Sequence, residues 1–583
     1  MIKKVCFYIF LFFCLLLNIV IDINIKNYFY ILNICFGKNI IITSKLYAFI
    51  CATIAIISIF IIIDILLVFF KNEVQNKGIK FKTEDGTHGT ANWMNENEMK
   101  NILGANETPG IILGKYNDDI IKLPFDSYFN KNISVFGSSG SMKTTSFLLT
   151  NLLELSKYKK SIVVTDPKSE IYRITSSYFK NIGYTVKVFN LKDMRHSDRW
   201  NPLGENETIT DVQTSSDVII SNTQRHDKGG DEFWPRAEEN LLKAFEFYFL
   251  EALIDKNNLT NVYKKVASGD INEIDNIFKG LSPESPARMS YNIFASGSDT
   301  IKASVLTGLG TRLQAFQNED LQRLTSETDI DLTLPAKQPC IYYVVTSDVD
   351  SSNDFLASLF FTFLFIKLVR YADSKTDGKC DIDVFCFLDE FCNIGAIPDF
   401  NKKISTVRSR QIALIPICQN IAQIRSRYPN DIWQEIIGNC DTRLGLGTTD
   451  TLTAQYFCDS IGVSTVETES VKKSNSIEGD IGEYGQKNVS TLKRNLLNID
   501  EIMRLPANKL LVILRGNKPL LLDKMFYKTH PLAKKLKDSS IYDYNPAWTK
   551  NNPVVNAKNT ENTEKKEITK DNKKKAKLSF DTF

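Results

Sequence analysis

Two long apolar runs lie near the start of the chain. The first covers residues 5–21, with Asn18 as its polar interruption, and the second covers residues 46–70, with Asp64 as its only charge; the corresponding helices are predicted at about 5–22 and 46–70. A helix needs about 20 apolar residues to cross a bilayer. The pattern therefore predicts a membrane anchor over residues 1–77 with two transmembrane helices. No small-residue cleavage site follows the first run, which favours an uncleaved anchor over a signal peptide.

From residue 78 onward, short apolar runs alternate with longer amphipathic stretches. The runs of strand length cover residues 132–136, 161–165, 340–346, 384–388, 412–417, 443–447 and 509–514. The first two are separated by a helical pattern over Thr144–Tyr158. Strand, helix and strand in this order are typical of a parallel sheet. The sequence thus predicts an α/β domain.

Residues 204–327 interrupt this alternation. They show helical periodicity, as in Phe233–Leu253, and no convincing strand. We interpret them as an all-α insertion that divides the α/β domain into residues 78–203 and 328–548. Residues 549–583 are rich in Lys, Asn, Thr and Glu and almost lack apolar residues, which predicts a disordered Lys-rich tail.

Composition narrows the possible functions. The chain has 583 residues, with 71 Lys and Arg against 68 Asp and Glu, so its formal net charge is +3. That balance excludes a strongly basic DNA-coating protein and an acidic disordered one. The 4 histidines are scattered and the 11 cysteines form no CxxC pair, so neither a His-rich metal enzyme nor a zinc site is indicated.

A Gly/Ser-rich loop follows the strand at 132–136. It consists of Gly137, Ser138, Ser139, Gly140, Ser141, Met142, Lys143, Thr144 and Thr145. Small residues let backbone N–H groups face phosphates, a Lys reaches the β and γ oxygens, and a hydroxyl reaches Mg²⁺ at the start of a helix. The strict pattern has Gly where this chain has Met142. We expect the N–H of Met142 to serve if the local backbone is helical.

Three further candidates follow other strands. Asp389 and Glu390 end the apolar strand 384–388; the first would hold Mg²⁺ with Thr144, and the second would polarise the attacking water. The alternative is an exposed acidic turn. Gln419 follows the strand 412–417 and could sense the γ-phosphate or cap the next helix. Arg408 could stabilise phosphoryl charge in a neighbouring subunit, contact DNA, or form a surface ion pair.

The location of the nucleotide site sets the expected topology. Two spans place both termini on one side of the membrane, and a site that uses ATP needs that side to be cytoplasmic. We therefore expect a multi-pass plasma-membrane protein with a cytoplasmic main domain.

Several segments together resemble one known family, the type IV secretion coupling proteins, or TraG/TraD-like conjugal transfer ATPases. These segments are His88–Trp93, Gly137–Thr145, Asp166–Glu170, Arg199–Leu203, Phe233 and Trp234 with Ala237 and Glu238, Leu388–Phe391, and Gly516–Pro519 with Lys524 and Tyr527, which resemble the family's last core hairpin. The Met-Lys form of the phosphate loop is similar to that of a Gram-positive, integrative-element branch. The likeness extends from the membrane spans to about residue 531.

The resemblance implies a RecA-like P-loop ATPase domain with an inserted all-α domain, preceded by the two transmembrane helices. It also implies a homo-hexameric ring that uses ATP and Mg²⁺, with Glu390, Gln419 and Arg408 as catalytic residues. Its implied partners are single-stranded DNA with bound relaxase (the relaxosome), the type IV secretion channel proteins and the membrane.

Two other functions stay open from the residues alone. A DNA translocase of the FtsK/HerA kind would share the ATPase core, but its reader domain would lie at the C-terminus, where this tail is short and polar. A membrane cargo receptor, or docking platform, with little or no ATP hydrolysis would follow if Met142 prevents the loop from closing on phosphate.

Overall fold

The computed structural model describes residues 81, 86–224, 232–252, 257–347, 349–472 and 486–551. Both predicted membrane helices, residues 5–22 and 46–70, lie outside the described residues, as do residues 552–583 of the predicted tail. The described chain continues to Asn551 and Thr549 is buried, so the folded part extends past the boundary predicted at residue 548.

A 12-stranded mixed sheet forms the centre of the α/β domain. In sheet order the strands are β1 (Gly104–Ala105), β3 (Asp119–Pro124), β2 (Gly110–Tyr116), β14 (Leu520–Asp523), β13 (Lys509–Leu514), β10 (Thr442–Gly445), β4 (Ile133–Phe136), β9 (Ile412–Cys418), β8 (Val384–Leu388), β5 (Ser161–Thr165), β7 (Cys340–Val345) and β6 (Thr185–Asn190). Strands β10 to β6 pair in parallel, and β1 to β13 pair antiparallel. The predicted α/β class is confirmed.

Five strands of the large sheet have no predicted range: β1, β2, β3, β6 and β14. Strands β2 and β3 form a hairpin whose register shifts between Ile112 and Gly114, so apolar residues do not alternate regularly along β2. Residues Ile111, Ile112 and Leu113 are all buried, which gives a short apolar run without a strand period. Strand β6 is buried only in its second half, so its hydrophobic signal is also short.

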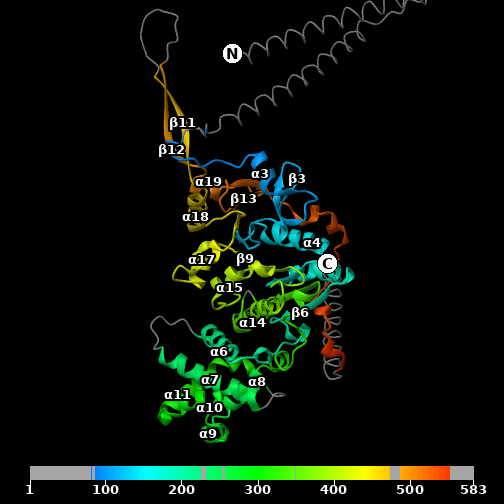
Figure 1. The fold of residues 1–583 in the computed structure, drawn as a ribbon, viewed down its shortest axis with the longest axis vertical. Coiled ribbons are helices and arrows are strands. Elements are labelled where there is room, and N and C mark those ends of the chain that lie inside the picture. Colours follow the sequence, from blue (N-terminus) through cyan, green and yellow to red (C-terminus); the bar gives the residue numbers. More distant parts are fainter. Residues whose placement is uncertain are drawn as a thin grey trace, which may run out of the picture. The chain divides into compact units, whose positions relative to one another are not determined.

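Helices cover both faces of the sheet (Figure 1). Helices α4 (Leu149–Lys157) and α5 (Glu170–Asn181) pack their apolar residues against one face, in a core that includes Ile133 and Ile162. Helix α14 (Asp354–Asp373) packs on the other face, where Phe360 stacks on Phe189 of β6 with ring centroids 5.0 Å apart. Burying a large apolar side chain contributes about 1.5–3 kcal/mol.

Helix α14 is also the one described helix that is long and apolar enough to cross a membrane. Most of its most apolar stretch is buried inside the protein. Its lysine Lys367 contacts Glu207 at 2.6 Å, and its arginine Arg370 contacts Asp211 at 2.6 Å. A helix with charged side chains paired to neighbouring segments and apolar ones packed on a sheet is a core helix.

Shorter helices flank the sheet on its remaining sides. They are α3 (Glu96–Ile102), α13 (Leu334–Lys337), α15 (Phe400–Thr406), α16 (Ile421–Arg427), α17 (Ile432–Gly438), α18 (Thr451–Ile461) and α19 (Ile499–Met503). Strands β11 (Val463–Lys472) and β12 (Gln486–Asn495) form a separate two-stranded sheet.

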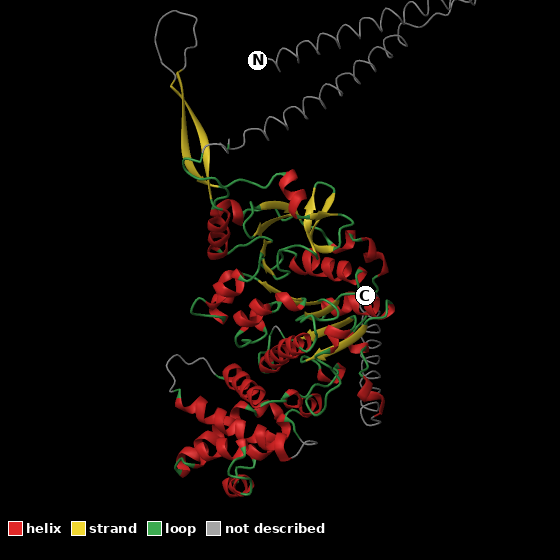
Figure 2. Ribbon diagram, viewed as in Figure 1, coloured by secondary structure: helices red, strands yellow, loops and turns green. Residues whose placement is uncertain are grey.

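Between β6 and β7 the described elements are helical, as Figure 2 shows. They include α6 (Ile209–Thr223), α7 (Phe233–Ala252), α8 (Leu259–Ala267), α9 (Ile271–Lys279), α10 (Pro286–Ala295), α11 (Asp299–Arg312) and α12 (Glu319–Leu324). Helix α6 begins with a capping box, in which the side chains of Thr208 and Asp211 each accept the other residue's backbone N–H. Because Asp211 also pairs with Arg370, the start of α6 is attached to the core helix α14.

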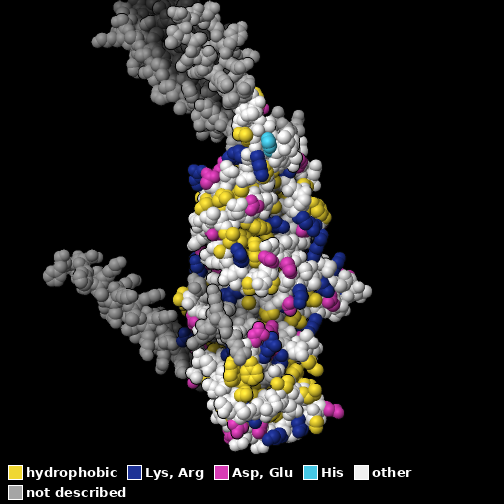
Figure 3. Space-filling view, turned by 90° about the vertical axis from the view of Figure 1, so that its left-hand side faces the viewer, with side chains coloured by type: hydrophobic (Ala, Val, Ile, Leu, Met, Phe, Trp, Pro, Cys, Tyr) yellow, Lys and Arg dark blue, Asp and Glu magenta, His cyan; other side chains and the backbone are white. Residues whose placement is uncertain are grey.

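Charged side chains of both signs mix on one face of the molecule. On the face drawn in Figure 3, Lys and Arg lie interspersed with Asp and Glu, and apolar side chains lie between them. This face therefore carries no extended field of one sign, in agreement with the small formal charge of the chain.

Candidate nucleotide site

The predicted phosphate loop and acidic residues lie at one edge of the sheet. Strands β4, β9 and β8 are neighbours and parallel, so their carboxyl ends lie side by side. The loop follows β4, Gln419 follows β9, and Asp389 with Glu390 follows β8. Ligands of open α/β sheets bind at such carboxyl ends. The structure thus brings together all the predicted site residues except Arg408.

Glycine is favoured at two places in the loop. A Cβ atom at Gly137 would lie 2.3 Å from the Ser141 hydroxyl oxygen, so a side chain at this position would force Ser141 to move. Gly140 has a φ of 80°, which glycine adopts without penalty. A Cβ atom at Gly140 would meet no atom within 4 Å, so glycine is favoured there by the backbone conformation and at Gly137 by the close approach of Ser141.

Met142 adopts a left-handed conformation, with φ 66° and ψ 27°. The Met142 N–H was expected to serve if the local backbone is helical; the residue lies in the left-handed region instead, and the helix begins only after it. The left-handed region costs a residue with a Cβ about 1–2 kcal/mol, which is why glycine is usual at such a position. The helix begins at the next residue, as a π-helical turn η1 (Lys143–Leu148) that continues into α4.

The loop lysine lies inside the site. Lys143 is buried, and its Nζ donates to the Gly137 carbonyl at 2.5 Å. The same Nζ lies 4.0 Å from Glu390 Oε1. The ammonium therefore sits between the loop and the acidic strand end, where a phosphate chain would be bound.

The oxygen atoms expected to hold Mg²⁺ are adjacent. Thr144 Oγ1 donates to Asp389 Oδ2 at 3.3 Å. Hydroxyl and carboxylate oxygens are the ligands that Mg²⁺ prefers. Burial raises the pKa of Asp389 to about 7, with the nearby Glu390 carboxylate acting in the same direction and Lys143 opposing both. A buried carboxylate lacking a full counter-charge fits a site for a divalent cation.

Glu390 is held by an amide chain. Gln419 Nε2 donates to Glu390 Oε2 at 3.0 Å, and Gln423 Nε2 donates to Gln419 Oε1 at 3.4 Å. Gln423 lies on α16, so the chain of contacts links the strand end to that helix. Glu390 itself has a φ of 50°, another left-handed residue with a side chain. Such strain is concentrated at functional sites.

Arg408 lies at the opposite end of the strands. It precedes β9, and its guanidinium donates to the carbonyl of Tyr128, which precedes β4. Arg410 instead binds Asp373 through two nitrogens, at 2.7 and 3.1 Å. Arg408 cannot reach the phosphate loop of its own chain, since β4 and β9 separate the two. Of these two arginines, Arg408 is the one that makes no ion pair within the described residues.

One contributor to the site was not predicted as a site residue, although it belongs to the segment that resembles the family's last core hairpin. Lys524 follows β14, and its Nζ donates to the Ser141 carbonyl at 3.0 Å and to the Leu446 carbonyl at 2.6 Å. Burial lowers its pKa to about 8. A lysine after a strand near the end of the chain carries no local signal that it will contact a loop near residue 140.

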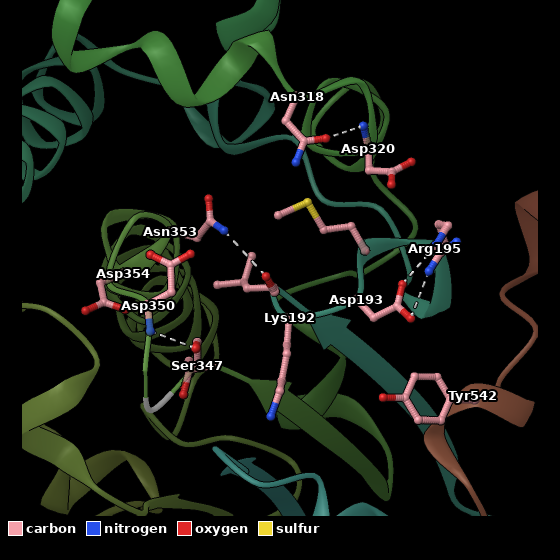
Figure 4. A pocket seen from close by; sticks show the side chains of 13 residues that line it. Lys192, Asp193, Arg195, Asn318, Asp320, Ser347, Asp350, Asn353, Asp354 and Tyr542 are labelled. Carbon is pink, nitrogen blue, oxygen red and sulfur yellow. Dashed lines mark hydrogen bonds and ion pairs between the residues drawn. The ribbon is translucent and has the colours of Figure 1, made fainter.

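A separate polar cavity of about 490 Å³ lies at the carboxyl ends of β6 and β7 (Figure 4). Among the side chains that line it, Arg195 donates to Asp193 at 3.1 and 3.5 Å. Asn353 donates to the Leu191 carbonyl at its rim, at 3.5 Å. None of the predicted site residues lines this cavity.

Comparison with known proteins places the chain in a family. Residues 91–568 match the family described as type IV secretory system conjugative DNA transfer. VirD4 of Rhizobium radiobacter is 25% identical over 470 residues, which cover 77% of this chain and 65% of VirD4. A conjugal transfer protein TraG of Escherichia coli is 22% identical over 481 residues, covering 73% of each chain.

Solved structures of the coupling protein TrwB share the fold. An unbound form, described as a bacterial conjugative coupling protein, has a TM-score of 0.57 at 15% identity and covers 76% of this chain and 94% of its own. A TrwB complex with ADP and Mg²⁺ also has a TM-score of 0.57 at 15% identity, with 75% and 94% covered. Since the family match spans most of the sequence, this protein belongs to the conjugative DNA transfer family of type IV secretion systems, the coupling proteins.

Proposed function

We propose that this protein is a membrane-anchored coupling ATPase. It receives single-stranded DNA with bound relaxase and passes it to a type IV secretion channel, using ATP hydrolysis as the driving reaction. The observation that carries the proposal is the convergence of Lys143, Thr144, Asp389 and Glu390 at the ends of β4 and β8. The TrwB structure described with ADP and Mg²⁺ supports the same ligands.

Each residue has a role that follows from its position. Lys143 binds the β- and γ-phosphate oxygens, and the backbone N–H groups of the loop surround them. Thr144 and Asp389 hold Mg²⁺, which, when bound, neutralises charge on those oxygens. Glu390 orients and polarises the attacking water, and Gln419 holds the Glu390 carboxylate in place through the bond described above.

Arg408 acts on a neighbouring subunit. In a homo-hexameric ring, the amino ends of the strands in one subunit would face the phosphate loop of the next. An arginine whose only hydrogen-bonding partner in the described chain is a backbone carbonyl is free to turn toward that site. Its guanidinium would stabilise the charge on the transferred phosphoryl group.

The two predicted spans, residues 5–22 and 46–70, anchor the protein in the plasma membrane with the ATPase domain in the cytoplasm. We keep the domain limits at 1–77, 78–203 and 204–327, and extend the second part of the α/β domain from 328–548 to 328–551, so that the tail begins after Asn551. We place the all-α insertion where it can contact incoming cargo. The helices between β6 and β7 support this division.

ATP hydrolysis by the full-length protein in detergent tests this proposal. We expect turnover that rises with single-stranded DNA and is lost in Lys143→Ala and in Glu390→Gln. Glu273→Gln is the control, because Glu273 makes an exposed ion pair with Lys265 on the insertion. Full retention of turnover in Glu390→Gln would contradict the proposed role of that residue. Absence of turnover in the assembled wild type would favour a cargo receptor that does not hydrolyse ATP.

A further inference from the structure

The phosphate loop contains a strained residue, Met142, that must be held in place by contacts from outside the loop. Met142 occupies a left-handed backbone position that glycine would adopt freely. A residue stays in such a conformation only where the surrounding structure holds it there. The question is which contacts do so before any nucleotide binds.

Lys524 makes the contact best placed to hold Met142. The peptide group between Ser141 and Met142 contains the Ser141 carbonyl, and rotating this group changes the φ of Met142. The Lys524 ammonium has no alternative partner of opposite charge: within the described residues no carboxylate oxygen lies within 4 Å of it, and its two bonds go to the carbonyls of Ser141 and Leu446. Fixing the Ser141 carbonyl therefore restricts the rotation that would release Met142.

The second carbonyl provides the anchor. Leu446 directly follows β10, and its N–H donates to the Phe136 carbonyl, at the end of β4, at 2.8 Å. Ser138 N–H donates to the Gly447 carbonyl at 3.0 Å. Lys524 thus joins the far side of the loop to the same chain segment that already holds its near side.

Lys524 differs from the two other lysines of its hairpin in the groups that it contacts. Lys509 pairs with Asp523 at 2.9 Å, and Lys518 pairs with Glu98 at 2.5 Å. Lys524 alone among the three is directed to backbone carbonyls. A desolvated ammonium with no carboxylate is costly unless its hydrogen bonds are satisfied, and charged donors make the stronger hydrogen bonds to carbonyls.

We propose that Lys524 is a positioning residue that clamps the phosphate loop in the left-handed form at Met142, replacing the conformational freedom that glycine would provide. It acts on the backbone behind the loop, through Ser141, rather than on phosphate. Lys524 holds the loop in this conformation before any nucleotide is bound. Only the expected effect on ATP binding rests on the proposed function.

A four-protein comparison tests the clamp. The full-length wild type, Lys524→Met, Met142→Gly and the double variant are examined by hydrogen–deuterium exchange of residues 137–147 without nucleotide, and by equilibrium binding of ATP with Mg²⁺. Lys518→Met is the matched control, since it removes an ammonium from the same hairpin. Lys524→Arg tests whether a second cationic donor restores the bonds.

We expect Lys524→Met to raise exchange in the loop and to weaken ATP binding about tenfold, the effect of losing one net charge-assisted bond. The double variant should bind ATP less than about threefold more weakly than Met142→Gly alone, because glycine adopts the left-handed conformation without a clamp. We expect Lys518→Met to have no effect on either readout and Lys524→Arg to restore part of the binding.

Equal losses of ATP affinity on adding Lys524→Met to the wild type and to Met142→Gly would overturn the clamp. Lys524 would then contribute to binding independently of the strain at Met142. Unchanged exchange and binding in Lys524→Met would overturn it too. If the wild type binds no ATP, the proposed function fails, while the exchange measurement still decides the clamp.

Discussion

Met142 is one of several non-glycine residues with a left-handed backbone, and it occupies the glycine position of the phosphate loop. Its φ of 66° is strained for any residue with a side chain. We predict that Met142→Gly raises the free energy of unfolding by about 1 kcal/mol, because the relief of strain exceeds the added chain entropy. Chemical denaturation measures the shift. Met289→Gly is the control: Met289 lies on the exposed side of α10, where glycine should lower stability by about 1 kcal/mol.

A stability loss in Met142→Gly as large as that in Met289→Gly would contradict the strained loop. It would mean that position 142 behaves as an ordinary right-handed helical residue in solution.

Glu246 is a second residue with a specific energetic signature. It is buried on α7, accepts from Ser215 and from Asn206 at 3.3 Å, and burial raises its pKa to about 8. The folded state therefore keeps a proton that the unfolded chain releases above its ordinary pKa of about 4.3. The contribution of Glu246 to the free energy of unfolding is therefore complete below about pH 4.3. It declines as the pH rises from there to about 8, by up to about 1.4 kcal/mol per pH unit.

We predict that Glu246→Gln removes this decline, because glutamine stays neutral. Thermal unfolding of both proteins between pH 5 and pH 8 measures it. The difference in melting temperature, variant minus wild type, should increase with pH. A constant difference would show that Glu246 is not buried as a neutral acid.

Sequence reasoning worked at the residue scale where chemistry is local. Lys143, Thr144, Asp389 and Glu390 could be found because each lies in a segment that follows an apolar strand, and parallel strands place such segments at one edge. The contact of Lys524 to Ser141 could not be predicted, since it depends on the pairing of β14 with β13 and β2. The left-handed φ of Met142 was not predicted, because a methionine in the sequence does not indicate a positive φ as a glycine would.

At the scale of elements, helix α6 is joined to the segment that follows Glu390. Asn222, in its last turn, accepts the Ala396 N–H at 2.7 Å and donates to the Ala396 carbonyl at 3.0 Å. A Cβ at Gly395 would lie 2.8 Å from the Asn222 oxygen, so the approach is close. The insertion and the acidic strand end therefore share one amide contact.

We predict that Asn222→Ala lowers the DNA stimulation of ATP hydrolysis by at least about threefold, because two hydrogen bonds between the insertion and this segment are lost. Turnover with and without single-stranded DNA measures the effect. Ser221→Ala is the control, since Ser221 bonds within its own helix, to the Val218 carbonyl. Unaltered stimulation in Asn222→Ala would show that this contact does not connect the insertion to the site.

The elements themselves were predicted where their patterns were strong. Strands β5, β8 and β13 have the predicted bounds, and the helical pattern at Thr144–Tyr158 corresponds to η1 and α4. The hairpin β2–β3 was missed because its register shift interrupts the two-residue period. The long helix α14 is buried on several sides, so its apolar residues do not lie on one face. Its sequence therefore lacks the amphipathic pattern by which a helix is usually recognised.

At the scale of the whole molecule, the proposal requires that two copies complete one site. We predict that Arg408→Ala lowers ATP turnover about 10³-fold, the lower range for an arginine finger. Mixing Arg408→Ala protein with Lys143→Ala protein should restore activity, because an intact Arg408 from the second can face an intact loop of the first. Arg410→Ala should lose stability instead, by breaking the pair with Asp373. Mixtures that stay inactive would contradict action between subunits.

The central claim is that a phosphate loop with Met142 at the glycine position still forms a working nucleotide site. Equilibrium binding of ATP to the full-length protein, with and without Mg²⁺, tests it most directly, beside Lys143→Ala. We predict saturable binding that Mg²⁺ strengthens and that Lys143→Ala abolishes. Absence of binding, or equal binding by the wild type and Lys143→Ala, would contradict the account.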